Sequence, residues 1–316
     1  MNAAERAGLP IAPSRLGFGC ASLGSRVAPA AGLDALAAAF DAGVNWFDVA
    51  PAYGAGQAEA LLGRFLRGRR DRAIVVTKVG MAPPRRLGAM RLAYALGRPL
   101  AARAASLRRG FRGLAATRNR HLPLTADLIE RSIGESLKRL GLDTVDVYAL
   151  HDPDPADVAR QDVRAALARV LDRGQARAVA VAGGFDACRA AVAAGAPYSA
   201  LQTAVADLEY GGAELAGAGL LLVSHSVFGV GGGALERLAA RLAAAPQRHR
   251  RLVAAGYSAD RRRAAAELLL DCALADNPDG VVLASMFDAA HRAADLARVR
   301  RPASAMALGL LDEALA

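Results

Sequence analysis

Eight short apolar runs that alternate with helical patterns constrain the fold of this chain more than any other feature of its sequence. Strands that are apolar throughout, each followed by a helix, indicate a parallel sheet whose outer face is covered. Eight such units in 316 residues predict one α/β domain over 1–316, a (β/α)₈ barrel, better than an open doubly wound sheet. The runs are RLGFGCA (15–21), VNWFDVA (44–50), AIVVTKVG (73–80), TVDVYALH (144–151), RAVAVAGG (177–184), SALQTAVA (199–206), GLLLVSHS (219–226) and GVVLASMF (280–287).

The stretches between these runs mostly have apolar residues on one side of a helix. In LIERSIGESLKRLGL, for example, Ile129, Ile133, Leu137 and Leu140 recur at helical spacing. We expect helices over 32–42, 57–66, 126–140, 155–172, 186–194, weakly 211–216, 259–275, 288–299 and 303–316.

One segment, 81–124, interrupts the alternation after the third strand and is too long for an ordinary strand-to-helix connection. Between 81 and 126 the chain has ten arginines and no Asp, Glu or Lys, which equals the whole net charge of +10, so the rest of the chain is formally neutral. Composition therefore indicates one basic insertion rather than a general nucleic-acid-binding surface. We expect a solvated lid or binding loop, and contact of its arginines with an anionic substrate, nucleic acid or an anionic membrane is the alternative.

The cysteines and the N-terminal segment point to the cellular environment. Cys20, Cys188 and Cys272 lie far apart, without CxxC or Cys/His pairing, so we expect buried thiols in a reducing compartment and no metal site. The N-terminus lacks the basic and apolar regions of a signal peptide, and no apolar run is long enough to span a bilayer. The sequence thus predicts a soluble cytoplasmic protein.

Polar residues at the ends of neighbouring strands mark the expected active site. The C-terminal ends of barrel strands meet at one face, so Asp48, Lys78 and His151, with Tyr53 in the loop after Asp48, can converge. Tyrosine, with a pKa of about 10, is a poor acid at neutral pH, and a neighbouring ammonium lowers that pKa. Tyr53 is then the general acid, Lys78 its tuner and Asp48 the anchor of Lys78, while His151 donates a hydrogen bond to the same substrate oxygen.

Each of these residues alone also has a plain structural interpretation, such as a turn pair or a strand end. Their joint order makes that interpretation much weaker. Lys78 is further distinguished because the chain has 38 arginines and only two lysines, which suggests a need for a compact ammonium at this strand end.

The same residues lie in longer stretches that resemble the aldo-keto reductase family over nearly the whole chain, with bacterial sugar-dehydrogenase-like and aldehyde-reductase-like members most similar. The resemblance implies a (β/α)₈ barrel that binds NADP(H), or less often NAD(H), across its C-terminal mouth. It also implies that Tyr53 is the general acid and that Asp48, Lys78 and His151 complete a catalytic tetrad. The stretches are LGFGCASLG (16–24), DAGVNWFDVAPAYGAGQAEALLG (41–63), VVTKVG (75–80), IERSIGESLKRLGLDTVDVYALHDP (129–153), Gln202 and GVVLASM (280–286).

The cofactor half of the family pattern is less well matched. Where the family has a Ser-Asn pair for the nicotinamide carboxamide, this chain has Ala182 and Gly183, although Gln202 of the same set is present. HSVFG replaces a YSPLG-like stretch, so that His225 and the adjoining Ser226 are the candidate cofactor contacts there. The remaining candidates follow the eighth strand and are Asp288, His291, Arg292 and Asp295.

These departures leave two functions open. The first is an NAD(P)-dependent oxidoreductase that interconverts an aldehyde, ketone or sugar hemiacetal with the alcohol or lactone, with NADP preferred to NAD and a small carbonyl or sugar compound as substrate. The alternative is a divergent barrel with weakened cofactor binding that acts as a non-catalytic partner-binding or regulatory subunit. GVGGGA (229–234) resembles a dinucleotide-binding loop, but it comes late in the chain and lacks the expected acidic residue, so we expect a flexible loop there.

Overall fold

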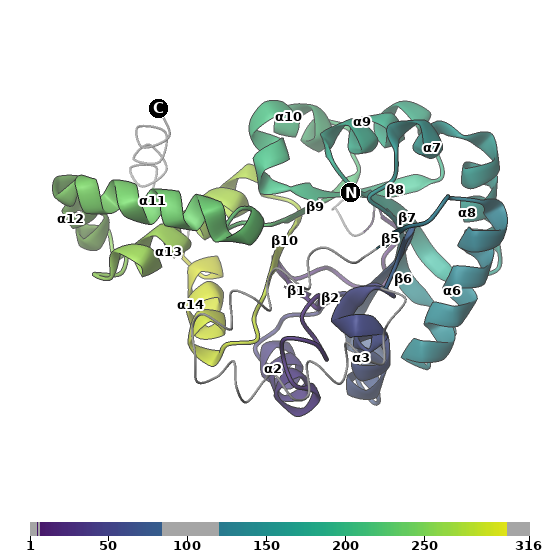
Figure 1. Ribbon diagram of the computed structural model, residues 1–316, viewed down its shortest axis with the longest axis horizontal. Helices are drawn as coiled ribbons and strands as arrows, with labels where there is room; N and C mark the ends of the chain where they lie inside the picture. The colour runs from purple at the N-terminus through teal and green to yellow at the C-terminus, as the bar shows by residue number, and fades with distance from the viewer. Residues whose placement is uncertain (1–4, 6, 84–119, 302–316) are drawn as a thin grey trace.

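The eight apolar runs form the parallel strands of a closed barrel, as predicted (Figure 1). The computed structural model describes residues 5, 7–83 and 120–301. Around the barrel the strands follow the order β1-β10-β9-β8-β7-β6-β3-β2, so that neighbours in the sheet are neighbours among the eight runs. The strands are β1 (Leu16–Gly19), β2 (Trp46–Asp48), β3 (Ile74–Val79), β6 (Val145–His151), β7 (Ala176–Ala182), β8 (Tyr198–Ala204), β9 (Leu221–His225) and β10 (Val281–Ala284).

Alternate residues of each strand face the barrel interior, and these are mostly small or β-branched. Trp46 is the one large side chain among them, and it is fully buried. Gly17 makes room for it, because a Cβ at that position would lie 2.7 Å from Trp46 and 2.5 Å from Leu283. The interior is therefore a packed core rather than a pore.

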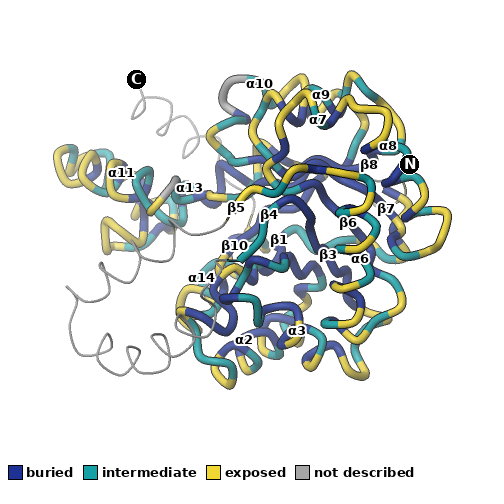
Figure 2. Tube along the Cα trace, turned by 45° about the vertical axis from the view of Figure 1, so that its right-hand side comes forward, coloured by how far each residue is buried: buried dark blue, intermediate teal, exposed yellow. Residues whose placement is uncertain are grey.

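Amphipathic helices cover the outside of the barrel and bury one side each (Figure 2). In α6 (Ala126–Leu140) the buried stripe contains Ile129, Ile133, Leu137 and Leu140, as expected. The Thr125 side chain caps this helix by accepting a hydrogen bond from the backbone of Leu128. The other helices are α2 (Pro29–Asp41), α3 (Ala58–Leu66), α7 (Pro155–Ala159), α8 (Gln161–Asp172), α9 (Phe185–Ala194), α10 (Val205–Gly217), α11 (Gly233–Ala244), α12 (Pro246–Ala254), α13 (Arg261–Asp276) and α14 (Ala289–Val299), with short 3₁₀ turns η1 (Tyr53–Gly56), η2 (Arg70–Arg72) and η3 (Val230–Gly232).

Two helices differ from the prediction. The single helix expected over 155–172 is divided into α7 and α8, because Arg160 between them has an extended backbone. The weak helix expected over 211–216 is the end of the longer α10, which is kinked at Gly211. A Cβ at Gly211 would lie 2.0 Å from the Phe185 ring, so glycine permits the close packing of α10 on α9.

The loop expected over 229–234 is present up to Gly232 and includes η3, but 233–254, for which no helix was predicted, form α11 and α12. We call residues 233–263 the arm; they comprise α11, α12 and the first turn of α13. The arm extends to one side of the barrel (left in Figure 1). Its core, together with the rest of α13, contains Leu235, Leu238, Leu242, Leu252, Tyr257, Ala264, Ala265, Leu268 and Cys272.

The basic insertion begins and ends at a two-stranded ribbon. β4 (Met81–Ala82) pairs antiparallel with β5 (Arg120–His121), and the Leu122 amide donates to the Gly80 carbonyl at 2.8 Å. Both ends of the insertion therefore lie at the C-terminal end of β3. The predicted lid over 84–119 and the predicted helix over 303–316 lie outside the described residues. No described helix has the length and apolar character needed to cross a membrane.

Candidate active site

Strand alternation brings the predicted polar residues to one end of the barrel interior. Asp48, Lys78, Gln202, His151 and His225 each lie two residues beyond an inward-facing core residue, on β2, β3, β8, β6 and β9 respectively. All five positions are at the C-terminal ends of their strands. The structure thus groups them around the mouth of the barrel, where this fold builds its active sites.

A buried ion pair lies at the base of this mouth. The Lys78 Nζ atom is 2.5 Å from Asp48 Oδ1 and 2.6 Å from Asp48 Oδ2, and the two side chains are only 1% and 3% exposed. Burial alone would lower the pKa of Lys78, but the Asp48 carboxylate and the Tyr53 hydroxyl outweigh it and raise that pKa above its usual value. Lys78 therefore remains an ammonium.

Tyr53 lies directly above this ammonium, at the start of η1. Lys78 Nζ is 5.1 Å from the centre of the Tyr53 ring, and its charge acts on the Tyr53 hydroxyl. The tight turn after Tyr53 depends on Gly54, which has φ 60° and approaches the Leu23 carbonyl so closely that a Cβ would lie 1.8 Å from its oxygen. Gly54 thus fixes where the strand-to-helix connection places Tyr53.

The pKa of Tyr53 departs from the expectation. Burial raises it, the Lys78 ammonium lowers it and the Asp48 carboxylate raises it again, so that the net pKa lies above the usual value rather than below it. The predicted lowering by Lys78 is real but is smaller than the effect of burial. Tyr53 is therefore a neutral hydroxyl at physiological pH, the form that can donate a proton.

His151 completes the predicted set. Its ring centre is 5.7 Å from that of Tyr53, with the two rings nearly perpendicular at 86°. Burial lowers the pKa of His151 to about 3, and the charges of Lys78, His225 and His121 act in the same direction. Its Nδ1 atom is buried and has no hydrogen-bond partner among the described residues. His151 is thus a neutral imidazole, in which one ring nitrogen carries a hydrogen and the other accepts.

Next to His151 lie Gln202, a predicted cofactor residue, and the two positions, Ala182 and Gly183, at which the family's polar side chains are absent. Gln202 is 6% exposed and pairs in register with Ala182 of β7, while the Gly183 amide donates to the Gln202 carbonyl at 3.0 Å. At Ala182 and Gly183 the chain therefore presents no polar side chain beside the Gln202 amide.

His225 and Ser226 lie on the next strand and its connection. The His225 Nδ1 atom is 2.9 Å from Ser226 Oγ, and burial lowers the pKa of His225. Ser226 has φ 58°, a left-handed conformation that is uncommon for serine and often marks functional turns. Both residues thus lie at the mouth, as predicted, with Ser226 exposed.

The four remaining candidates lie at or on α14. Asp288 caps this helix by accepting from the backbone of Ala290 and His291, both at 2.9 Å, and these N–H groups hold its pKa below the usual value. His291 is 71% exposed, and Arg292 donates to the Met286 carbonyl at 3.0 Å. Burial raises the pKa of Asp295 to about 6. No contact joins these four residues to the buried ion pair within the described part of the chain.

Two residues near the tetrad were not predicted. The backbone amide of Cys20 donates to the backbone carbonyl of Asp48 at 2.9 Å. Burial raises the pKa of the Cys20 thiol, and the charge of the Asp48 carboxylate raises it further. His121, at the base of the insertion, lies 3.5 Å from Asp152, which follows His151. Cys20 could have been predicted, because it follows the first strand at the end where the other site residues lie. The contact of His121 with Asp152 could not, because it depends on the pairing of β4 with β5. Within the described ranges no three His, Cys, Asp or Glu side chains are grouped as metal ligands.

Comparisons with known proteins give the same family as the sequence motifs. The model of the Aldo/keto reductase family matches residues 15–268. A D-threo-aldose 1-dehydrogenase of Pseudomonas sp is 35% identical over 193 residues, which cover 57% of this chain and 52% of that protein. An L-galactose dehydrogenase of Arabidopsis thaliana is 30% identical over 178 residues, 54% of this chain and 44% of that protein. The chain thus spans about half the length of the curated relatives it matches.

Solved structures share the fold over nearly the whole chain. An aldo-keto reductase from Klebsiella pneumoniae in complex with NADPH superposes with a TM-score of 0.71 at 20% identity and covers 98% of this chain and 93% of that one. At this identity the likeness concerns the barrel alone. The family model, in contrast, extends from the first barrel strand into α13, and the protein therefore belongs to the aldo/keto reductase family.

Proposed function

We propose that this protein is an NAD(P)-dependent oxidoreductase that interconverts an aldehyde, ketone or sugar hemiacetal with the corresponding alcohol or lactone. The observation that carries the proposal is the Lys78 ammonium, buried between the Asp48 carboxylate and the Tyr53 hydroxyl. A structural salt bridge does not require a phenol hydroxyl beside it. Protonation of a carbonyl oxygen, in contrast, requires a proton donor such as this hydroxyl.

In the direction of reduction, Tyr53 gives its proton to the carbonyl oxygen of the substrate as negative charge develops there. Lys78 stabilises the phenolate that remains, and Asp48 keeps Lys78 charged and in place. Because His151 is neutral, it donates its N–H to the same oxygen without adding a second positive charge. In oxidation the same groups act in reverse, and Tyr53 must first lose its proton.

The inner face at Gln202 and Ala182 fits a nicotinamide, since it offers one side-chain amide beside a small apolar residue at the mouth. A bound nicotinamide supplies the hydride in reduction and accepts it in oxidation. Gln202, His225 and Ser226 would hold its ring end, and residues of α14 its adenosine end.

The preference between NADP and NAD depends on α14. Arg292 and exposed His291 favour a 2′-phosphate, whereas the ionised Asp288 opposes one, although its carboxylate is already engaged in capping the helix. We propose NADP(H) as the better cofactor. The Klebsiella reductase that shares the barrel was solved with NADPH, which is consistent with this choice.

Sugars are the proposed substrate class. Two relatives of the chain are an aldose dehydrogenase, 35% identical, and a galactose dehydrogenase, 30% identical. The mouth residues of this chain, a phenol, imidazoles and an amide, are groups that can hydrogen-bond hydroxyls.

The competing function is a non-catalytic partner-binding or regulatory subunit. The missing polar side chains at Ala182 and Gly183 favour it, because they leave the carboxamide with fewer partners. It predicts an intact tetrad without cofactor affinity, which separates the two functions experimentally.

Replacement of Tyr53 by phenylalanine tests the catalytic role directly. Tyr53→Phe removes the proton donor and leaves the ring, so we expect carbonyl reduction to fall by roughly 10²–10⁴-fold while the affinity for NADPH stays within about twofold. The readout is NADPH oxidation with a panel of aldehydes and aldoses, beside a binding titration. Retained turnover in Tyr53→Phe would rule out this role for Tyr53.

A further inference from the structure

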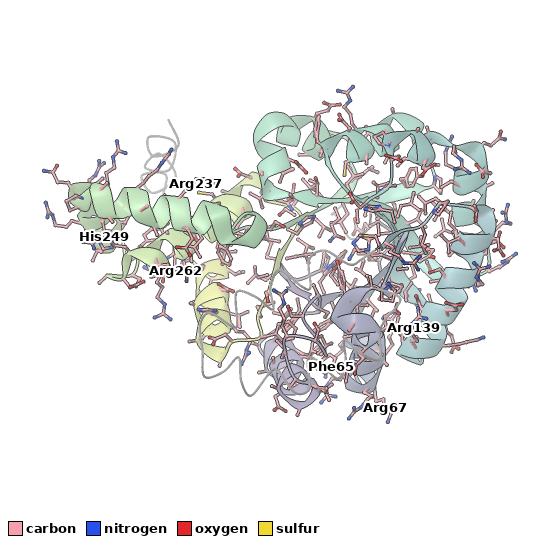
Figure 3. All side chains as sticks on the ribbon, in the orientation of Figure 1. Phe65, Arg67, Arg139, Arg237, His249 and Arg262 are labelled. Atoms are coloured by element: carbon pink, nitrogen blue, oxygen red, sulfur yellow. The ribbon has the colours of Figure 1, made fainter. Side chains whose placement is uncertain are left out.

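The neutrality of the chain outside the basic insertion conceals a second basic region. The arm, residues 233–263, contains eight arginines and only two carboxylates, a net charge of +6. The remainder of the chain outside the arm and 81–126 is correspondingly acidic, with a net charge of −6. The fold separates these charges in space, because the arm extends to the side of the barrel (Figure 3), where Arg237, His249 and Arg262 are labelled along it.

Seven of the eight arginines of the arm are exposed, Arg248 being partly buried, and six of these seven contact no described carboxylate. Arg262 pairs with Glu236, with Nη2 2.9 Å from Oε1, and the second carboxylate, Asp260, caps α13 by accepting from the Arg263 amide at 2.8 Å. The other exposed arginines contact no carboxylate among the side chains that the structure describes. They are Arg237, Arg241, Arg250, Arg251, Arg261 and Arg263.

The positions of these arginines are unfavourable for the arm itself. Arg261, Arg262 and Arg263 occupy the first turn of α13, which has no acidic residue and where the helix dipole repels positive charge. Arg237 and Arg241 are one turn apart on α11, a spacing at which like charges destabilise a helix. The packing of the arm does not require these charges, since its core is formed by leucines, alanines, Tyr257 and Cys272.

The extent and chemistry of the surface favour one class of partner. The 12 residues of α11 span about 18 Å, which is more than one small anion can contact. Arginine binds phosphate through paired N–H donors. A membrane surface would need exposed apolar anchors, but Val253 is the single large hydrophobic side chain that is exposed among the described residues. Stacking on single strands would need exposed aromatic rings, and Tyr257 is buried.

We propose that the arm binds the phosphate backbone of duplex nucleic acid, without sequence specificity. The site consists of the exposed arginines of α11, α12 and the first turn of α13. It is separate from the tetrad and does not depend on the proposed oxidoreductase activity.

The test is the binding of the full-length chain to a fluorescently labelled 20-base-pair duplex, measured by anisotropy between about 50 and 200 mM salt. We expect a dissociation constant on the order of 10 μM or tighter at the lowest salt, with a steep linear dependence of its logarithm on the logarithm of salt concentration. Two double variants, Arg237→Gln/Arg241→Gln and Arg261→Gln/Arg263→Gln, should each weaken binding several-fold and reduce the salt slope by about 2. Carbonyl reduction by these variants should stay unchanged.

The matched control is Arg169→Gln/Arg173→Gln, which removes the same charge from the barrel side, where both arginines pair with Glu130. Duplex binding should be unaltered in this control. The proposal is overturned if the full chain does not bind the duplex, or if the arm variants bind as well as the control. Binding to phosphatidylglycerol vesicles but not to the duplex, or arm-dependent self-association without duplex binding, would also overturn it.

Discussion

Lys78 is an ammonium in the barrel interior, a placement that destabilises a protein unless the charge is paired and hydrogen-bonded. Asp48 supplies the pair, the Val49 carbonyl accepts a further hydrogen bond at 3.5 Å, and Tyr53 lies on the remaining side of the ammonium. The consequence is a phenol whose pKa is set by two opposed effects, burial that raises it and the ammonium that lowers it. The balance keeps Tyr53 protonated, which suits the reduction of a carbonyl better than the oxidation of an alcohol at neutral pH.

The pH dependence of the reaction follows from these directions. In the proposed mechanism, reduction needs neutral Tyr53. Because the pKa of Tyr53 is raised above the ordinary value of about 10, we expect kcat/KM for reduction to stay level through neutral pH and to fall only above about pH 10. Oxidation should rise with pH over the same range. His151, with a pKa near 3, is already neutral at pH 5, so no acidic limb should belong to it. Rate profiles of wild type and His151→Gln check this, and an acidic limb near pH 6 that disappears in the variant would contradict it.

At the level of single residues the sequence is sufficient to place Asp48, Tyr53, Lys78 and His151 together, but not to give the direction in which the pKa of Tyr53 shifts. The order Asp48, Tyr53, Lys78, His151 on adjacent strand ends follows from the (β/α)₈ pattern. Whether burial or Lys78 dominates depends on the packing around the phenol, which no spacing of residues encodes. The contact between His121 and Asp152 was hidden for the same reason, since it depends on how the ribbon folds back.

The connection from β2 to α3 is the element that determines the position of Tyr53. Gly54→Ala forces a Cβ into the Leu23 carbonyl and also strains a backbone with positive φ. We expect the loop to shift and kcat to fall by at least tenfold, because a displacement of about 1 Å at a reacting group is costly. Gly134→Ala is the control: this glycine lies inside α6 with open space around it, so alanine should leave kcat unchanged and stabilise the protein by up to about 1 kcal/mol. Equal activity of both variants would show that the loop does not position Tyr53.

The attachment of the arm to the barrel is a buried polar cluster. Asp271 of α13 accepts from Tyr257 Oη at 2.5 Å and from Arg298 Nε at 2.9 Å, and thereby joins α13 and the arm to the end of α14. Asp271→Asn leaves the Arg298 guanidinium, 7% exposed, without its counter-ion, and we expect a loss of about 3–5 kcal/mol in the free energy of unfolding. Denaturant melts of this variant and of Glu236→Gln, which breaks only an exposed pair, provide the comparison. Equal midpoints would contradict the role of the cluster.

Elements were predictable where a periodic pattern continued long enough. All eight strands and α6 were confirmed, because a strongly apolar run favours a buried strand and a regular apolar stripe favours a helix over the alternatives. The helices α11 and α12 of the arm were not predicted, because the glycines from 229 to 233 mark a loop and Leu252 is the one buried residue of α12. The start of α13, in contrast, was predicted to within two residues. The break at Arg160 was missed because helical residues continue on both sides of it.

The whole molecule combines a barrel of net negative charge with two basic regions. A sum over the sequence outside 81–126 gives zero and hides the arm, since the barrel cancels its charge. The net charge of the sequence therefore does not show where the charges lie. The second basic region is recognised only when the arm and the barrel are considered separately. The family itself was recognisable from the sequence alone, because its motifs lie in the barrel, where strand order and inward-facing residues are fixed.

Binding of a cofactor to the folded chain should also stabilise the whole molecule. If NADPH binds only the native state, a concentration of 100 times the dissociation constant adds about 2.7 kcal/mol to the free energy of unfolding. Thermal melts with NADPH, NADH and neither should therefore differ in midpoint, with NADPH giving the larger shift. A larger shift with NADH would reverse the proposed preference.

The most direct test of the central claim is a fluorescence titration of Trp46 with NADPH and then NADH. Trp46 is the single tryptophan of the chain and lies in the barrel interior, two residues before Asp48 on the same inward-facing side. We predict saturable quenching with a dissociation constant on the order of micromolar for NADPH and weaker binding of NADH. If neither cofactor binds a protein whose circular dichroism shows it to be folded, the oxidoreductase function is contradicted and the cofactor-free subunit takes its place.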